Sequence, residues 1–193
     1  MRKVLIITYY WPPSGGSGVQ RWLKFSKYLP ENGWKPIIYT PLSNSFNIKD
    51  EDLVNEIHPD TEVWKHPIWE PYALKDKFFG KADSDNAGII QDKSSFKNRA
   101  MSWIRGNIFI PDPKVFWVSP SVKFLENKIK EHGITHIIST GPPHSMHLIA
   151  MNLKRKNEEL KWIADFRDPW SELDLLSEFY LTKRSKKKHK KLE

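Results

Sequence analysis

The chain has 193 residues, a formal net charge of +8 and no cysteine, which excludes disulfide bonds and thiol chemistry. The length suits one domain with a substantial core, and no apolar run approaches the roughly 20 residues that a membrane-spanning helix needs. Seven of the 31 Lys and Arg residues fall in 183–193, so the rest of the chain is nearly neutral. We therefore expect a cytoplasmic protein whose main body does not bind nucleic acid.

The first segment predicts a strand, a glycine loop and a helix. The unbroken β-branched run Lys3–Thr8 is typical of a parallel strand buried on both faces. Apolar residues then recur at helical spacing from about Gly18 onward. Between them lies the loop Trp11–Arg21, in which Gly15, Gly16, Ser17 and Gly18 would offer backbone amides at a helix N-terminus. Such a loop suits a phosphate or another anion.

Two common nucleotide-binding motifs do not fit this loop. The dinucleotide pattern G-x-G-x-x-G would need a third glycine where Arg21 stands, and an acidic residue after the second strand, where Pro41 stands. A P-loop needs Gly-Lys-Ser or Gly-Lys-Thr, and the sequence has neither triplet. These differences argue against NAD and against a P-loop nucleotide site. A glycine-rich turn that serves only as a tight connection stays open as an alternative.

The rest of the first half alternates between strands and helices and then becomes irregular. Gly33 is expected to end the first helix. About residues 67–110 we expect an irregular helical insertion, because long irregular segments in compact domains tend to be functional or disordered. The elements expected here are a strand at Lys35–Thr40, a short acidic helix at Asp50–Ile57, a strand at Glu62–His66, helices at Pro71–Phe79 and Phe96–Ile104, and a polar loop at Gly80–Gly88.

The second half completes the alternation. We expect a helix at Val115–His132, a strand at Thr135–Thr140, a helix after Gly141–His144, and a strand at Leu160–Asp165. This order predicts an α/β fold with a doubly wound, mainly parallel sheet. We expect one domain over residues 1–182, followed by a basic tail at 183–193.

Polar residues follow the first, fourth and fifth expected strands, so they should meet at one edge of the sheet. The glycine loop would offer amides, His144 an imidazole, and the last loop two carboxylates, Asp165 and Asp168, with Arg167 between them. This set suits a polar ligand with several hydroxyls. Two alternatives remain: His144 only caps its helix, and the charged trio only ties the fifth strand to its neighbours. His144 and His147 have no third clustered ligand, so we expect no metal site.

Four motifs in this order resemble one known family. They are Pro12-Pro-Ser-Gly-Gly-Ser-Gly18 with Arg21, Pro111-Asp-Pro113 with Trp117, Gly141-Pro-Pro-His144, and Ala164-Asp-Phe-Arg-Asp-Pro-Trp170. The combination is similar to the N-terminal domain of bacterial GT-B glycosyltransferases of family 4. The likeness covers nearly the whole chain, and the last motif is the most specific.

The resemblance implies a Rossmann-like domain that binds mainly the acceptor, with a second domain that binds most of the donor. The reaction implied is the retaining transfer of a sugar, of the hexosyltransferase class, from a nucleotide-diphosphate sugar to a glycan or lipid-linked acceptor in bacterial surface polysaccharide synthesis. No metal and no cofactor besides the donor is expected. We expect the C-terminal domain to be absent from this chain, and the fragment to be inactive alone.

The resemblance also suggests roles for individual residues. Catalytic roles fall to His144 and Asp168. Contacts to the donor phosphate or sugar fall to Gly15, Gly16, Ser17, Gly18 and Arg21. Acceptor contacts fall to Asp165, Arg167, Trp11 and Trp170, since aromatic faces are good platforms for sugar rings.

A hypothesis from another class competes with this one. The chain would be a non-catalytic Rossmann-like binding module, whose basic tail docks on a membrane or on nucleic acid. Under the enzyme hypothesis the same tail suggests peripheral contact with anionic lipid on the inner face of the plasma membrane.

Overall fold

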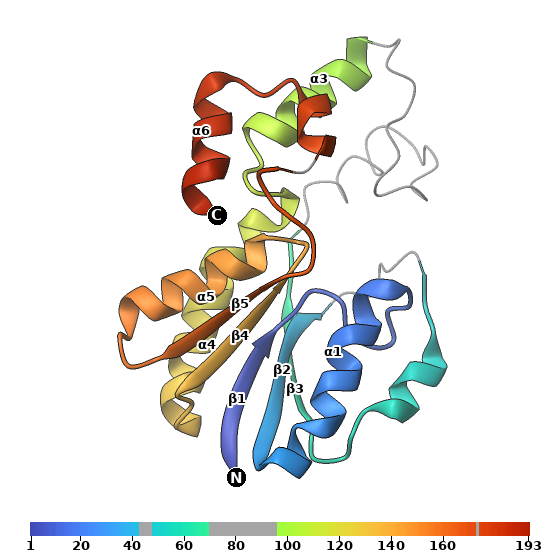
Figure 1. Ribbon diagram of the computed structural model, residues 1–193, viewed down its shortest axis with the longest axis vertical. Helices are drawn as coiled ribbons and strands as arrows, with labels where there is room; N and C mark the ends of the chain where they lie inside the picture. The colour runs from blue at the N-terminus through green and yellow to red at the C-terminus, as the bar shows by residue number, and fades with distance from the viewer. Residues whose placement is uncertain (43–47, 70–95, 173) are drawn as a thin grey trace. The chain divides into compact units, whose positions relative to one another are not determined.

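The computed structural model describes residues 1–42, 48–69, 96–172 and 174–193 (Figure 1). The chain divides into two compact units. The first unit consists of Met1–Ile68 and Trp117–Arg167, and the second of Trp69–Phe116 and Asp168–Glu193. The insertion expected at about 67–110 and the basic segment expected at 183–193 thus fall largely within one unit.

The first unit is built on a five-stranded sheet in the order β3-β2-β1-β4-β5, in which every neighbouring pair is parallel (Figure 1). This arrangement confirms the predicted doubly wound, Rossmann-like α/β fold. The strands are β1 (Arg2–Ile7), β2 (Trp34–Leu42), β3 (Glu62–Pro67), β4 (His136–Gly141) and β5 (Lys161–Phe166).

Helices cover the two faces of this sheet (Figure 1). On one face α1 (Ser17–Tyr28) packs its buried stripe, including Val19 and Leu23, against β1 and β2. On the other face α4 (Val118–His132) and α5 (Ser145–Lys156) lie side by side. The central strands are buried on both sides by this arrangement, which explains why β1 reads as an unbroken apolar run.

Tyr39 fixes the second face of the sheet to α4. Its ring stacks on Trp117 with centroids 4.9 Å apart, and its hydroxyl donates to Ser121 Oγ at 2.8 Å. Burial raises the pKa of the Tyr39 hydroxyl, which therefore stays protonated and able to donate. The hydrogen bond satisfies a polar group that the apolar surroundings would otherwise penalise.

Two expected α-helices differ from prediction. The segment expected as a helix from Val115 begins as the 3₁₀ helix η3 (Pro113–Trp117), and α4 follows only at Val118. The reason is local: the Asp112 carbonyl accepts from the Val115 amide in an i to i+3 turn, and Pro120 fits only the first turn of an α-helix. The short acidic helix is also 3₁₀, η2 (Glu51–Glu56).

Of the two glycines expected to end helices, Gly133 closes α4 in the left-handed conformation as predicted. Gly33 is also left-handed, but it closes the 3₁₀ helix η1 (Pro30–Asn32), because α1 has already ended at Tyr28. The helix expected at Pro71–Phe79 and the polar loop at Gly80–Gly88 lie outside the described residues.

The second unit contains α3 (Phe96–Asn107), the 3₁₀ helix η4 (Asp174–Phe179) and α6 (Lys183–Leu192). The basic segment is thus a helix, with Thr182 Oγ1 accepting from the Ser185 amide as its N-cap. His189 anchors it, since Nε2 contacts the Gly106 carbonyl at 3.2 Å and Nδ1 accepts from Trp170 Nε1 at 3.0 Å. Burial lowers the pKa of His189, which favours this neutral, doubly bonded ring.

Within the described ranges, every helix is too short or too polar to cross a lipid bilayer.

Burial differs sharply between neighbouring strands, which allows a matched stability test. Ile137 on β4 is fully buried, whereas Ile163 on the edge strand β5 is 63% exposed. We expect Ile137→Ala to lower the free energy of unfolding by about 2–5 kcal/mol, through lost burial and a cavity. Ile163→Ala should change it by less than about 0.5 kcal/mol. Urea titration of both variants checks this, and equal losses would contradict the described packing.

Candidate functional site

The glycine loop lies between the carboxyl end of β1 and the first turn of α1. Its backbone is held by the segment at 48–50: the Gly15 amide donates to the Ile48 carbonyl at 2.9 Å, and the Asp50 amide donates to the Pro13 carbonyl at 2.9 Å. A Cβ on Gly15 would come within 2.9 Å of the Ile48 side chain, so the close packing requires glycine there. Gly16, with φ of 86°, is the N-cap of α1 and provides no side-chain acceptor.

The start of α1 is therefore capped by no side chain, and Gly16 and Ser17 are exposed. Backbone amides at such an end carry the positive end of the helix dipole. Such a helix start would suit an anion, and the anion site expected from the sequence stays a prediction.

Asp165, at the end of β5, has partners on two other elements. Its Oδ1 lies 2.9 Å from Arg21 Nη2, and its Oδ2 accepts from Trp22 Nε1 at 2.8 Å and from Thr140 Oγ1 at 3.0 Å. The carboxylate side chain is only 14% exposed. Three donors from α1 and β4 thus surround a carboxylate at the end of β5, and little of its acceptor capacity is left for a ligand.

Arg21 and Asp165 were expected to contact donor and acceptor respectively, and the structure pairs them with each other. This pairing favours the alternative in which the charged residues tie the fifth strand to its neighbours. The two residues Trp22 and Thr140 were not singled out for the site in the sequence. Trp22 fits the apolar stripe of α1. Its hydrogen bond to Asp165 joins residues 143 positions apart, so no local sequence pattern predicts it.

Arg167 lies at the same end of the sheet, directly after β5. Its amide donates to the Gly141 carbonyl at 3.1 Å, which fixes its main chain to the last residue of β4. A Cβ built on Gly18 would lie 3.2 Å from Arg167 Nη1 and 3.0 Å from the Tyr10 ring. The guanidinium therefore lies against the first turn of α1, close enough that a Cβ on Gly18 would press on it and on the Tyr10 ring. Loops after β1, β4 and β5 meet here, as predicted.

The loop after β4 carries two buried histidines. His144 is 8% exposed and precedes α5, but its side chain makes no capping hydrogen bond to the helix. His147 is 2% exposed, and its Nδ1 lies 2.8 Å from Ser139 Oγ, which also accepts from Trp162 Nε1 at 2.9 Å. Among the described residues, Nε2 of His147 has no hydrogen-bond partner.

His144 and His147 lie close to each other. The two rings are stacked with centroids 5.8 Å apart. In the part of the chain that the structure describes, no group of three His, Cys, Asp or Glu side chains is placed to hold a metal ion.

Two tryptophans expected to flank an acceptor cleft are buried instead. Trp11 is 1% exposed and packs in the cluster beneath α1, and Trp170 is 2% exposed and bonds His189 in the second unit. Neither ring offers an open face to a sugar in this structure. Burial of a large apolar ring stabilises the fold, and it prevails here although both residues flank motif loops.

Asp168, expected as a catalytic residue, belongs to the second unit.

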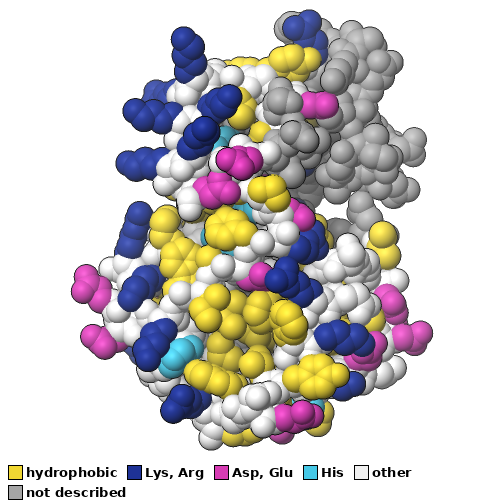
Figure 2. Space-filling model, in the orientation of Figure 1, with side chains coloured by type: hydrophobic (Ala, Val, Ile, Leu, Met, Phe, Trp, Pro, Cys, Tyr) yellow, Lys and Arg dark blue, Asp and Glu magenta, His cyan; other side chains and the backbone are white. Residues whose placement is uncertain are grey.

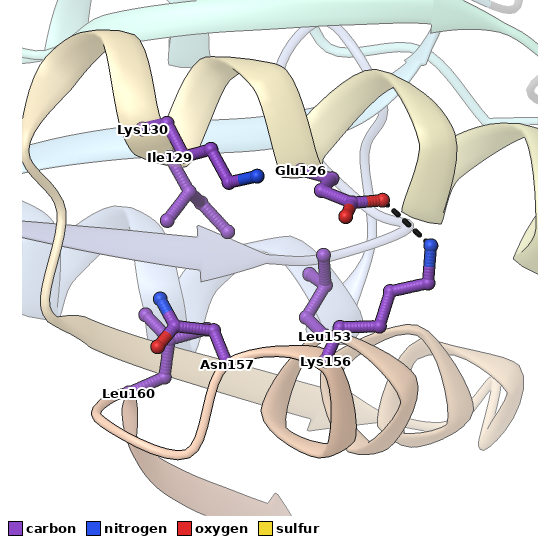
Figure 3. Close-up of a pocket in the computed structure, with 7 residues that line it drawn as sticks. All are labelled: Glu126, Ile129, Lys130, Leu153, Lys156, Asn157 and Leu160. Atoms are coloured by element: carbon purple, nitrogen blue, oxygen red, sulfur yellow. Dashed lines mark hydrogen bonds and ion pairs between the residues drawn. The ribbon is translucent and has the colours of Figure 1, made fainter.

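A small hollow between α4 and α5 lies away from the candidate site (Figure 3). Its volume is about 20 Å³, and Leu153, Asn157 and Leu160 line it near the C-terminus of α5. Glu126 and Lys156 pair across it at 2.6 Å. It has room for about one water molecule and lies toward the end of α5 opposite the candidate site, so it offers no substrate pocket.

Comparisons with known proteins give no identification. No protein-family model matches the chain, and no curated protein matches its sequence.

The burial of His147 generates a pH prediction. The pKa of His147 is lowered from the ordinary 6.5 to about 4, mainly by burial and to a smaller extent by the nearby His144. The unfolded chain therefore binds this proton at higher pH than the folded chain does. The free energy of unfolding is therefore highest above pH 6.5. It falls as the pH drops toward 4, by an amount on the order of 3 kcal/mol.

His147→Asn removes the titrating ring but keeps an acceptor for Ser139. We expect the variant to unfold at lower urea concentration at pH 7, with a shallower loss of stability between pH 6.5 and 4. Urea titrations at several pH values measure both slopes. Equal slopes for the two proteins would contradict the lowered pKa.

Proposed function

We propose that this chain acts as the acceptor-side domain of a GT-B glycosyltransferase of family 4. The reaction is the retaining transfer of a sugar from a nucleotide-diphosphate sugar to a glycan or lipid-linked acceptor, in bacterial surface polysaccharide synthesis. One observation carries the proposal: the guanidinium of Arg167 lies beside Gly18 at the uncapped N-terminus of α1. A guanidinium and helix amides at one place form a site for a phosphate group.

This arrangement fits the chemistry of sugar transfer. As the bond between sugar and diphosphate breaks, negative charge grows on the leaving phosphate. Donors that are already fixed in place stabilise that charge without reorganising. The main chain of Arg167 is held by the Gly141 carbonyl, and the glycine loop by the segment at 48–50. The backbone amides of the loop therefore meet the requirement of preorganisation, and the exposed Arg167 guanidinium adds a positive charge beside them.

The remaining roles rest on the family resemblance. His144 stands after β4, at the same end of the sheet, and we assign it to a hydroxyl of the transferred sugar. Asp168, two residues after β5, takes the proposed catalytic role. Arg21 and Asp165 take a positioning role in place of direct contacts, because they hold each other and bring α1 to the end of β5.

Anion binding by the loop is testable with inorganic pyrophosphate as the probe. We expect millimolar pyrophosphate to shift the amide NMR signals of Gly15–Gly18, and Arg167→Gln to weaken the affinity about tenfold by removing a charge-assisted bond. Lys123→Gln, which removes an exposed charge on α4, is the matched control. Shifts confined to α6, or equal losses in both variants, would contradict a built site at the loop.

Sugar transfer itself is tested separately, with the complete open reading frame that encodes this chain. We expect it to transfer sugar from one of a panel of radiolabelled UDP- and GDP-sugars to lipid-linked acceptors in bacterial membranes. The 193 residues alone should transfer none. In the complete protein Arg167→Gln should lower the rate about tenfold or more, and Lys123→Gln should leave it unchanged. Turnover by the fragment alone, or no transfer by the complete protein with any donor, counts against the proposal.

A further inference from the structure

The second unit has a solvent-facing surface that the proposed reaction does not use. All seven basic side chains of α6 are exposed, while Ser185 and His189 face inward. Figure 2 shows the Lys and Arg side chains gathered over this helix. The exposed basic residues are Lys183, Arg184, Lys186, Lys187, Lys188, Lys190 and Lys191.

Aromatic residues lie beside the start of this helix. Arg99 and Trp103 are one turn apart on α3, both exposed, and the Arg99 guanidinium lies 5.5 Å from the Tyr180 ring centroid. Asn107, one turn further, donates to the carbonyls of Trp103 and Tyr180. Trp103 and Tyr180 are each 43% exposed. Asn107 thus joins the main chains of Trp103 and Tyr180, and the Arg99 guanidinium lies against the Tyr180 ring.

The same residue links these rings to the basic helix. Asn107 Oδ1 accepts from the Thr182 amide at 2.8 Å, and Thr182 is the N-cap of α6. Lys183 and Arg184 follow directly. Ile108, next to Asn107, is 55% exposed. We call this set the aromatic–basic surface: Arg99, Trp103, Ile108, Tyr180 and the basic residues of α6.

We propose that the aromatic–basic surface binds the surface of an anionic lipid bilayer. Each Lys or Arg near an anionic membrane contributes about 1 kcal/mol, and Trp and Tyr favour the interface between headgroups and acyl chains. Charge alone would also attract nucleic acid, but an aliphatic side chain such as Ile108 has no ring to stack on a base. It does gain by entering the acyl boundary. The proposal does not rest on sugar transfer.

Vesicle co-sedimentation with the full 193-residue chain tests this. The vesicles are phosphatidylcholine alone, or phosphatidylcholine with about one third phosphatidylglycerol. We expect binding only to the anionic vesicles, weakening as salt rises. The triple variant Lys183→Gln, Arg184→Gln, Lys187→Gln should bind at least about tenfold more weakly.

Two further proteins make the test specific. The control Lys27→Gln, Lys123→Gln, Lys161→Gln removes three exposed charges from the first unit and should bind like the parent chain. Trp103→Ala keeps every charge and should weaken the binding that persists at high salt. Circular dichroism confirms that each variant is folded.

The proposal is overturned by three results. One is no binding to anionic vesicles at low salt. Another is equal loss in the two triple variants, which would mean a diffuse charge effect. The third is tighter binding to a single-stranded oligonucleotide than to the vesicles, lost in the same α6 variant, which would assign the surface to nucleic acid.

Discussion

The carboxylate of Asp165 is the junction on which the candidate site depends. It joins α1, through Arg21 and Trp22, to the ends of β4 and β5. A largely buried carboxylate is stable only when charge and hydrogen bonds replace water, and here three donors do so. Because those donors come from separate elements, the requirement to satisfy one side chain fixes the position of α1 against the carboxyl ends of two strands.

That junction also decides which charge faces the glycine loop. Arg21 is paired with Asp165, and the helix amides supply the positive end of the α1 dipole at the loop. An arginine compensated by a carboxylate attracts an anion weakly. Substitution of Arg21 would therefore act through the position of α1, whereas the Arg167 guanidinium lies directly beside Gly18 in the first turn.

The sequence predicts the architecture well and the contacts of the site poorly. Unbroken apolar strands, glycine helix ends and the β-α alternation are local signals, and the parallel sheet follows from them. Polar residues after β1, β4 and β5 meet at one edge, as the topology requires. The bond between Trp22 and Asp165 joins residues 143 apart, so no local pattern encodes it. Trp11 shows the converse error: position beside a motif suggested a ligand platform, and burial of a large ring prevailed.

The two proposed surfaces use charge in physically different ways. At the glycine loop the α1 amides are fixed donors at short range, so orientation and hydrogen bonding decide what binds. On α6 the basic side chains are long and exposed, and the helix is anchored through His189 on its inner face and through Thr182 at its N-cap. Their attraction is diffuse and is screened within about 8 Å at physiological ionic strength. Salt should therefore separate the two surfaces: binding at α6 weakens steeply as salt rises, and the fixed donors at the loop are affected less.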